Sequence, residues 1–394
     1  MNQTQMMASY KSTFETEPTH LFFAPGRINL IGEHTDYNGG HVFPAAITFG
    51  TYVLMRLRDD DLVRFYSANF SEAGVIERRL DDLAFRPEDD WTNYPKAMLH
   101  LLNERTGRID RGLDLWFFGN IPNGAGLSSS ASIELATAFG LNTIYGLGLN
   151  PLDLVKLGQR AENEYIGVNS GIMDQFAIGM GKRGHAMLLD CDTLDCEYAP
   201  VDLDGVSIVI MNTNKRRELA DSKYNERRSE CETALARLQT TLSIQSLGEL
   251  TPETFEAAAS VIEDDVLVMR ARHAVYENAR TLEALVALKE NRLADFGQLM
   301  NDSHVSLRDE YEVTGIELDT LVEAAWANGA IGARMTGAGF GGCAIALVRD
   351  ADIESFQQAV RDKYTREVGY APTFYVASIG AGAHELQLET KEEV

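Results

Sequence analysis

The stretch Gly124-Ala125-Gly126-Leu127-Ser128-Ser129-Ser130-Ala131-Ser132-Ile133-Glu134 decides the fold of this chain. Its two glycines permit unusual backbone dihedral angles and a close approach to a ligand. Its four serines supply hydroxyl donors, and a helix that begins among them leaves several backbone N–H groups without intrahelical partners. Such N–H groups and the positive end of the helix dipole attract anions, usually phosphates. The stretch therefore predicts a phosphate-binding loop or, more plainly, a serine-capped helix after a flexible turn.

The residues around this loop predict a mixed α and β structure. Strand-forming residues fill 51–55 and 113–118 before it. Residues 128–146 are small and apolar all round, which is typical of a buried helix. Asn150 and Pro151 are a favourable cap and first residue for a further helix, which Gly167 can end.

A second part of different composition follows. Residues 206–211 predict a short buried strand, and residues 215–328 are mostly helical in pattern. The last part predicts a strand, a helix and another strand, which implies a helix packed on a sheet. The expected fold class is α+β in two domains, 1–202 and 203–394. Residues 1–18 of the first domain are expected to form a polar lead-in.

Composition narrows the class of function. The chain has 394 residues and a formal net charge of -24, which argues against nucleic acid or an anionic membrane as a partner, because both are bound mainly by Lys and Arg. The first residues lack the apolar core of a signal peptide, and no apolar run reaches the length of a membrane span. Four cysteines without CxxC pairing or zinc spacing indicate reduced thiols in a cytoplasmic protein.

The segment 25–40 groups polar residues between turn residues, with too many glycines for a regular element. Glu33, His34 and Asp36 supply the acceptors and the switchable donor that a hydroxyl-rich ligand requires. A solvated loop of charged residues is the alternative. A metal site made of the same three residues ranks last, since no second histidine stands at ligand spacing.

Two acidic residues are candidates for phosphoryl-transfer chemistry. Ser170 is expected to cap a short helix with Asp174 in its first turn, where a carboxylate stays ionised. An ionised carboxylate is a weak base, but phosphoryl transfer depends mostly on positioning and charge stabilisation. Glu162 and a serine hydroxyl would be oxygen ligands suited to Mg²⁺ if the Glu162 helix packs beside the loop. The alternatives are that Asp174 only stabilises its own helix and that Glu162 is a solvated residue on a helix face.

The glycines at 337, 339 and 342 match GxGxxG but precede a predicted strand, so a dinucleotide-binding site is not expected. A glycine hairpin that covers a ligand fits better. The chain has neither a Walker A motif nor the HRD and DFG elements of protein kinases. Tyr224, on a helix rich in charge, could serve packing or ligand contact.

Together these stretches resemble the GHMP kinase superfamily, small-molecule kinases that bind ATP with a glycine-serine loop. Residues 122–132 resemble its nucleotide loop and residues 337–342 its late glycine motif. Within it, the segment Gly26-Arg27-Ile28-Asn29-Leu30-Ile31-Gly32-Glu33-His34-Thr35-Asp36-Tyr37 resembles the signature of the galactokinases. Gly171-Ile172-Met173-Asp174-Gln175 supports this resemblance, which spans roughly residues 20 to 380.

The resemblance implies an N-terminal α/β domain like domain 2 of ribosomal protein S5 and a C-terminal ferredoxin-like domain. It implies that Asp174 accepts the proton of the anomeric hydroxyl and that Arg27 stabilises the developing charge. The expected sugar-binding residues are Glu33, His34, Thr35, Asp36, Gly171 and Tyr224. The expected ATP-binding residues are Ser67, Trp91, Gly124, Ala125, Gly126, Leu127, Ser128, Ser129 and Ser130, with Mg²⁺ on Ser130 and Glu162.

The implied activity is transfer of the ATP γ-phosphate to α-D-galactose, which gives α-D-galactose 1-phosphate and ADP, the first committed step of the Leloir pathway. The implied partners are these small molecules only, and the chain is expected to be a monomer. Some galactokinase-like proteins sense sugar and ATP without turnover, but the Ser-Ala pair that the best-known example lacks is present at 130–131. A kinase for N-acetylgalactosamine is a third option. Ser170 is a departure, because many relatives carry Cys there.

Overall fold

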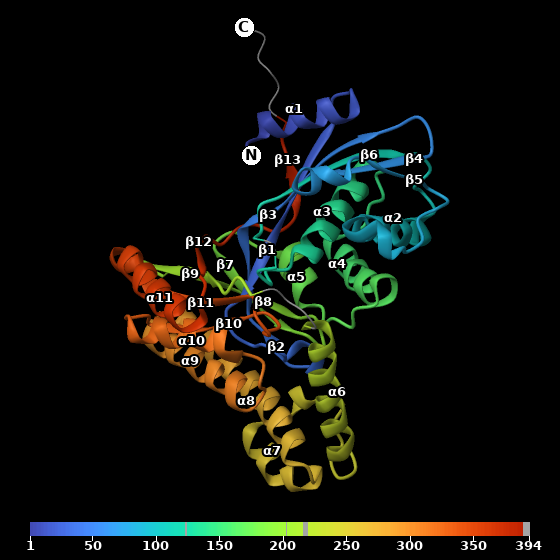
Figure 1. Cartoon of the computed structure of the whole chain (residues 1–394). Helices are drawn as coiled ribbons and strands as arrows, with labels where there is room; N and C mark the ends of the chain where they lie inside the picture. The colour runs from blue at the N-terminus through green and yellow to red at the C-terminus, as the bar shows by residue number, and fades with distance from the viewer. Residues whose placement is uncertain (123, 202, 216–219, 389–394) are drawn as a thin grey trace.

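A six-stranded sheet with helices on one face forms the N-terminal part of the molecule (Figure 1). The computed structural model describes residues 1–122, 124–201, 203–215 and 220–388. The strands lie in the order β13-β1-β3-β6-β4-β5, and among these described pairs only β4 and β6 are parallel. Their bounds are β1 (His20–Asn29), β3 (Pro44–Leu57), β4 (Leu62–Ser67), β5 (Ile76–Arg79), β6 (Leu113–Gly119) and β13 (His384–Leu386).

Helices and a smaller sheet complete this part. Apolar residues of the six-stranded sheet pack against α2 (Asn93–Thr106), α3 (Ser129–Ile144), α4 (Pro151–Arg160) and α5 (Met173–Met180). The smaller sheet contains β2 (His41–Val42), β7 (His185–Asp190) and β8 (Cys196–Pro200). The predicted strands at 51–55 and 113–118 and the predicted buried helix after the loop are confirmed as parts of β3, β6 and α3.

The other face of the six-stranded sheet is covered by α1 (Gln3–Phe14). Met6, Tyr10 and Phe14 recur every four residues and are buried against Leu54 and Trp116. The expectation that residues 1–18 form only a polar lead-in is therefore wrong, because three apolar residues on one helical face are enough to dock the helix.

The C-terminal part has a four-stranded antiparallel sheet in the order β10-β11-β9-β12. Its strands are β9 (Val206–Asn212), β10 (Gly332–Thr336), β11 (Cys343–Arg349) and β12 (Thr373–Ala377). Helices follow β9, α11 (Ile353–Val368) lies between β11 and β12, and β10 and β11 form a hairpin. This is the strand-helix-strand-strand-helix-strand topology of a ferredoxin-like domain, as predicted.

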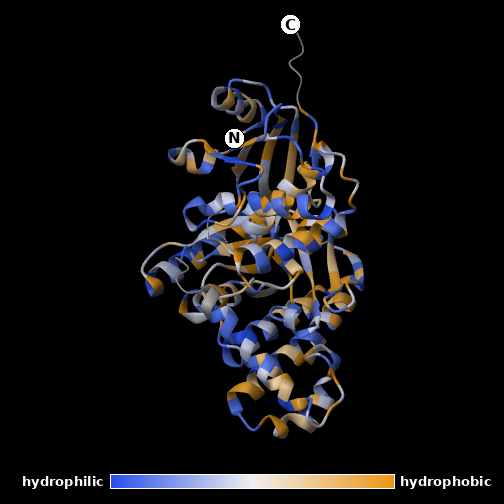
Figure 2. Cartoon of the chain, turned by 90° about the vertical axis from the view of Figure 1, so that its right-hand side faces the viewer, coloured by the Kyte–Doolittle hydropathy of each residue, from blue (hydrophilic) through white to orange (hydrophobic). Residues whose placement is uncertain are grey.

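A helical region separates β9 from β10 and extends away from the sheets (Figure 1). It contains α6 (Ala220–Leu238), α7 (Pro252–Ala258), α8 (Asp265–Lys289), α9 (Leu293–Asp309) and α10 (Gly315–Ala327). Hydrophilic and hydrophobic segments alternate along these helices (Figure 2), as expected when one face is buried and the other exposed. Within the described ranges, no helix is both long and apolar enough to span a membrane.

Short helical turns lie at several junctions. They are η1 (Asp36–Asn38), η2 (Ala68–Ala73), η3 (Pro87–Thr92), the π-helical η4 (Ala161–Ile166), η5 (Leu247–Glu249), η6 (Ala259–Ile262) and η7 (Asp350–Asp352). Near its end the chain returns to the first sheet, where β13 pairs with β1 and the Gly380 N–H donates to the Ala46 carbonyl at 2.8 Å. The last residues of the predicted second domain therefore belong with the N-terminal sheet. The domain boundary between residues 202 and 203 stays a prediction.

Candidate active site

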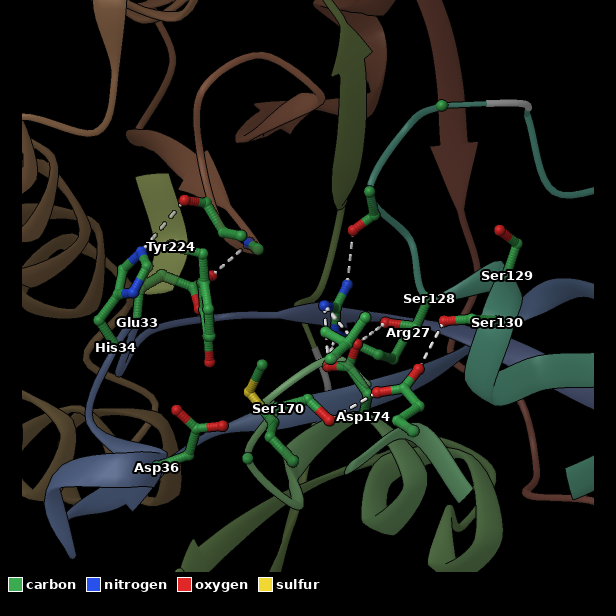
Figure 3. A pocket seen from close by; sticks show the side chains of 18 residues that line it. Arg27, Glu33, His34, Asp36, Ser128, Ser129, Ser130, Ser170, Asp174 and Tyr224 are labelled. Atoms are coloured by element: carbon green, nitrogen blue, oxygen red, sulfur yellow. Dashed lines mark hydrogen bonds and ion pairs between the residues drawn. The ribbon is translucent and has the colours of Figure 1, made fainter. Parts of the chain in front are cut away.

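One cavity of about 260 Å³ brings together residues from all the stretches singled out in the sequence. The predicted site residues that line it are Arg27, Glu33, His34, Asp36, Gly124, Gly126, Ser128, Ser129, Ser130, Glu162, Gly171, Asp174 and Tyr224. In Figure 3, Glu33, His34, Asp36 and Tyr224 lie on one side of the Arg27 and Asp174 pair, and Ser129 and Ser130 lie on the other. The cavity therefore has two halves that meet at an arginine and an aspartate.

Arg27 and Asp174 form a two-pronged ion pair at this junction. Arg27 Nε donates to Asp174 Oδ1 at 2.8 Å, and its Nη2 donates to Oδ2 at 3.0 Å. Arg27 is only 4% exposed and lies on β1, where the pairing register with β3 shifts between Pro25 and Arg27. The expectation that residues 25–40 contain no regular element is thus wrong at its start, because pairing with β3 holds residues 25–29 in a strand.

The glycine-serine loop reaches the same pair. Arg27 Nη1 donates to the Gly126 carbonyl at 2.7 Å, and the Ser128 hydroxyl donates to Asp174 Oδ2. Ser128 has a left-handed backbone (φ 61°) and makes no capping bond at the start of α3. The alternative of a serine-capped helix after a flexible turn is therefore wrong. The N–H groups of the first turn of α3 therefore have no side-chain cap and point toward the cavity end of the helix.

Five predicted residues do not line the cavity. Ala125 and Leu127 are each 1% exposed and pack their side chains into the core beneath the loop. Thr35 is fully buried and donates to the His41 carbonyl at 2.6 Å. Ser67 accepts from the Asn69 N–H at the start of η2, and Trp91 lines a separate groove with Phe70 and Asp90. Nucleotide contacts for Ser67 and Trp91 stay predictions.

Glu162 lies on a π-helical turn that continues α4. Such turns often mark functional sites, because the wider turn moves one residue out of the regular helical register. Its Oε1 accepts from Ser130 at 2.8 Å and its Oε2 from Ser170 at 2.6 Å, while burial raises the pKa of Glu162. The prediction that Ser170 caps the Asp174 helix is wrong, since α5 begins at Met173 without a side-chain cap, although Asp174 does lie in its first turn.

The described residues contain no group of three or more His, Cys, Asp or Glu side chains that could hold a metal ion. A hydroxyl and a carboxylate facing the phosphate-binding loop are nevertheless the donor set that Mg²⁺ uses when substrate phosphates supply further ligands. Ser130 and Glu162 therefore fit such an ion.

On the opposite side of the cavity, Glu33 is almost fully committed to protein contacts. It is 1% exposed, and its oxygens accept from Asn29 Nδ2 at 2.8 Å and from the Gly337 N–H at 2.6 Å. Burial raises the pKa of Glu33, and the nearby Arg334 opposes this shift. Glu33 thus joins β1 to the late glycine motif.

His34 also has a left-handed backbone (φ 62°), which aims its ring at this motif. Its Nε2 lies 3.1 Å from the Ala338 carbonyl and its Nδ1 lies 2.8 Å from the Tyr37 hydroxyl. A carbonyl only accepts, so Nε2 carries the proton and Nδ1 accepts from Tyr37. Burial, followed by the charge of His273, lowers the pKa of His34 to about 3, and the ring is neutral at physiological pH.

Asp36, Gly171 and Tyr224 form the remaining wall. Burial and the charge of Asp174 raise the pKa of Asp36 to about 7. A Cβ atom at position 171 would overlap the Asp36 carboxylate, so only glycine allows this approach. Burial raises the pKa of Tyr224 well above its usual value, so its hydroxyl stays protonated and can donate.

A buried ionic network that was not predicted from the sequence lies behind Glu33. Arg334 is fully buried and donates to the Asn29 carbonyl at 3.2 Å and to Glu33 Oε1 at 3.4 Å. Its Nη2 lies 3.5 Å from Glu277 Oε1. Although burial opposes the shift, Arg280 and Arg334 lower the pKa of Glu277 to about 2. The position of Arg334, three residues before the first late glycine, Gly337, was a signal that the sequence did offer.

Family models match three parts of the chain. They are described as "GHMP kinases N terminal domain" (residues 93–182), "Galactokinase galactose-binding signature" (residues 8–57) and "GHMP kinases C terminal" (residues 284–366). The signature includes Arg27, Glu33, His34 and Asp36, and the first domain includes the loop, Glu162 and Asp174. The matches therefore cover both halves of the cavity.

The chain is also similar to proteins named galactokinase. That of Exiguobacterium sibiricum is 61% identical and covers 96% of this chain and 97% of the relative, and that of Streptococcus thermophilus is 57% identical over 98% and 100%. The structure of Lactococcus lactis galactokinase complexed with galactose has a TM-score of 0.95 and 52% identity, over 97% of this chain and 99% of that chain. A mevalonate kinase structure, 19% identical with a TM-score of 0.67 over 92% and 99% of the chains, shares the fold. The chain belongs to the galactokinase family of GHMP kinases.

Proposed function

We propose that this enzyme transfers the γ-phosphate of ATP to the anomeric hydroxyl of α-D-galactose, giving α-D-galactose 1-phosphate and ADP. The observation that carries the proposal is the Arg27 and Asp174 pair, which lies where the phosphate-binding loop meets the polar wall of the cavity. A sugar hydroxyl held on one side of this pair and a phosphate held on the other would meet beside it.

In this proposal Asp174 accepts or orients the proton of the anomeric hydroxyl. Its carboxylate accepts from Arg27 twice and from Ser128, so its position is fixed. Phosphoryl transfer suits such a group, since its loose transition state depends mostly on alignment and charge stabilisation. Arg27 adds a buried positive charge next to the oxygens that gain negative charge.

The loop residues 124–130 would hold the phosphates through backbone N–H groups and serine hydroxyls. Ser130 and Glu162 would hold Mg²⁺. A bound Mg²⁺ would neutralise charge on the phosphate oxygens. The late glycine hairpin, which contributes Gly337 and Ala338 to the cavity, would cover the ligands from the C-terminal part.

The sugar hydroxyls would bind to Glu33, His34, Asp36, Gly171 and Tyr224, with Thr35 holding the turn beneath them. Protonated Tyr224 offers a donor and the carboxylates offer acceptors, whereas the one N–H of neutral His34 donates to the Ala338 carbonyl and orients the ring. We also propose that the enzyme is a cytoplasmic monomer. ATP is plentiful in that compartment, and the cysteines of the described residues form no disulfide.

The test is ADP release with Mg-ATP and, separately, galactose, N-acetylgalactosamine, glucose and mevalonate. Of these four compounds, only galactose is expected to give strong ADP release. Sugar-dependent ATP binding without release would contradict the proposal and indicate a sensor. Faster ADP release with N-acetylgalactosamine than with galactose would indicate that the 2-acetamido sugar is the substrate.

A further inference from the structure

Ser170 lies between the two halves of the site (Figure 3), and its hydroxyl contacts Glu162, the carboxylate that is proposed to hold the cation. Its Oγ donates to Glu162 Oε2 at 2.6 Å and also lies 3.3 Å from Asn163 Oδ1. A hydroxyl has one proton, and the shorter contact to a carboxylate oxygen is the stronger bond. Ser170 is therefore a hydrogen-bond donor to Glu162.

The backbone fixes this contact. The N–H groups of Gly167 and Val168 both donate to the Glu162 carbonyl, at 2.8 and 2.9 Å. The N–H of Ser170 donates to Asn163 Oδ1 at 3.0 Å. The segment that carries Ser170 is thus fastened to the π-helical turn that carries Glu162, which keeps the two residues close together.

The two oxygens of Glu162 consequently have different neighbours. Oε2 accepts from Ser170, whereas Oε1 accepts from Ser130 on the phosphate-binding loop. Mg²⁺ requires a strict octahedral arrangement and binds few carboxylate oxygens, whereas Ca²⁺ has flexible coordination and readily takes both oxygens of one carboxylate. If Ser130 and Glu162 Oε1 both bind the cation, Ser170 still engages Oε2, and a carboxylate with one oxygen left for the metal suits the smaller ion.

We propose that Ser170 is a positioning residue that leaves Glu162 one oxygen for the cation and thereby makes the site prefer Mg²⁺ over Ca²⁺. The inference rests on the proposed function, because it takes Ser130 and Glu162 as the cation ligands. Partners that orient metal ligands commonly change metal affinity by about 10- to 100-fold when they are removed.

The test compares binding of β,γ-imido-ATP, which cannot transfer its terminal phosphate, in its Mg²⁺ form, its Ca²⁺ form and without metal in EDTA. Calorimetric titrations use the wild type, Ser170→Ala and Ser170→Cys. Ser207→Ala is the matched control, since that serine also donates to a carboxylate, Asp350, at 2.6 Å but lies outside the cavity.

Ser170→Ala is expected to weaken binding of the Mg²⁺ form about tenfold, to change the Ca²⁺ form much less and to leave metal-free binding unchanged. Ser170→Cys should fall between, because a thiol is a weaker donor, and Ser207→Ala should match the wild type. An unchanged ratio of Mg²⁺ to Ca²⁺ affinities in Ser170→Ala would overturn the inference, as would equal weakening of metal-free binding. Galactose-dependent ADP release by the wild type tests the proposed function separately. The proposed function and the role of Ser170 can therefore be contradicted independently of each other.

Discussion

The Asp174 carboxylate accepts hydrogen bonds from Arg27 and from Ser128, which lie in two separate segments of the chain. The resemblance to galactokinases predicted Asp174 and Arg27 as a pair, and the structure places them in contact. The bond from Ser128 was not predictable, because it depends on a left-handed backbone at a residue that looks like an ordinary helix cap. The same limit explains Ser170, whose hydroxyl contacts Glu162 instead of capping a helix.

A prediction at the residue scale concerns Asp36. Asp174 and Glu33 raise its pKa by charge in addition to burial, and the Tyr37 N–H and Arg228 oppose them, leaving a pKa of about 7. Hydrogen bonds from sugar hydroxyls would favour the ionised form and lower this pKa in the complex. Binding then releases a proton. Galactose affinity should therefore increase by up to about tenfold for each unit by which the pH is raised toward 7, and it should level off above pH 7.

Calorimetric titration of galactose between pH 5.5 and 8, without nucleotide, measures this dependence. In Asp36→Asn the affinity should be lower and nearly constant with pH, since the titrating group is gone. A wild-type affinity that is constant, or that increases as the pH falls, would refute the assignment.

At the scale of elements, the sequence predicted strands within β3, β6, β9, β11 and β12 and the helices α3, α4 and α11, whereas other described elements, α1, α2, β7 and β8 among them, were not predicted. The fragment 25–29 is a strand because β3 pairs with it, despite its proline and glycine. The helix α1 was missed because its polar residues outnumber Met6, Tyr10 and Phe14, although their spacing of four was a readable signal. The π-helical turn at Glu162 leaves no pattern in the sequence.

A prediction for α1 follows from its packing. Phe14 is 4% exposed and belongs to the cluster with Trp116 on the face of the sheet away from the cavity. Phe14→Ala should lower the free energy of unfolding by about 3–5 kcal/mol, through lost burial and the cavity left behind, without changing kcat. Urea denaturation measures the loss, with Phe70→Ala, at a 46% exposed position, as the control expected within about 0.5 kcal/mol. A loss in Phe14→Ala no larger than the control's would show that α1 is not docked.

At the scale of the whole molecule, the cavity depends on contacts between the two parts of the chain. Glu33 accepts from Gly337 and lies 3.4 Å from Arg334, and the His273 ring contacts the Glu33 carbonyl at 3.1 Å. The sequence predicted both parts and both glycine motifs, but not the buried charges that join them. Arg334 and Glu277 are 57 residues apart in sequence, and nothing local indicates that they meet.

Arg334→Met tests this junction. Removing one member of a buried ionic network leaves Glu33 and Glu277 without their common positive partner, so the free energy of unfolding should fall by about 3–5 kcal/mol. Galactose affinity should fall as well, since Glu33 would lose its position. Arg308→Met is the control, because half-buried Arg308 pairs with the exposed Asp309 and lies 3.8 Å from Glu323 near the surface, so stability should change by at most about 1 kcal/mol. Wild-type stability and galactose affinity in Arg334→Met would contradict this role of the network.

The most direct test of the central claim is kcat of Asp174→Asn, measured as galactose-dependent ADP release beside the galactose dissociation constant. The account predicts a loss of about 10²–10⁴-fold in kcat with the galactose affinity changed less than tenfold, because the amide keeps the shape of the carboxylate but cannot accept the proton or balance Arg27. Turnover by Asp174→Asn close to that of the wild type would contradict the account.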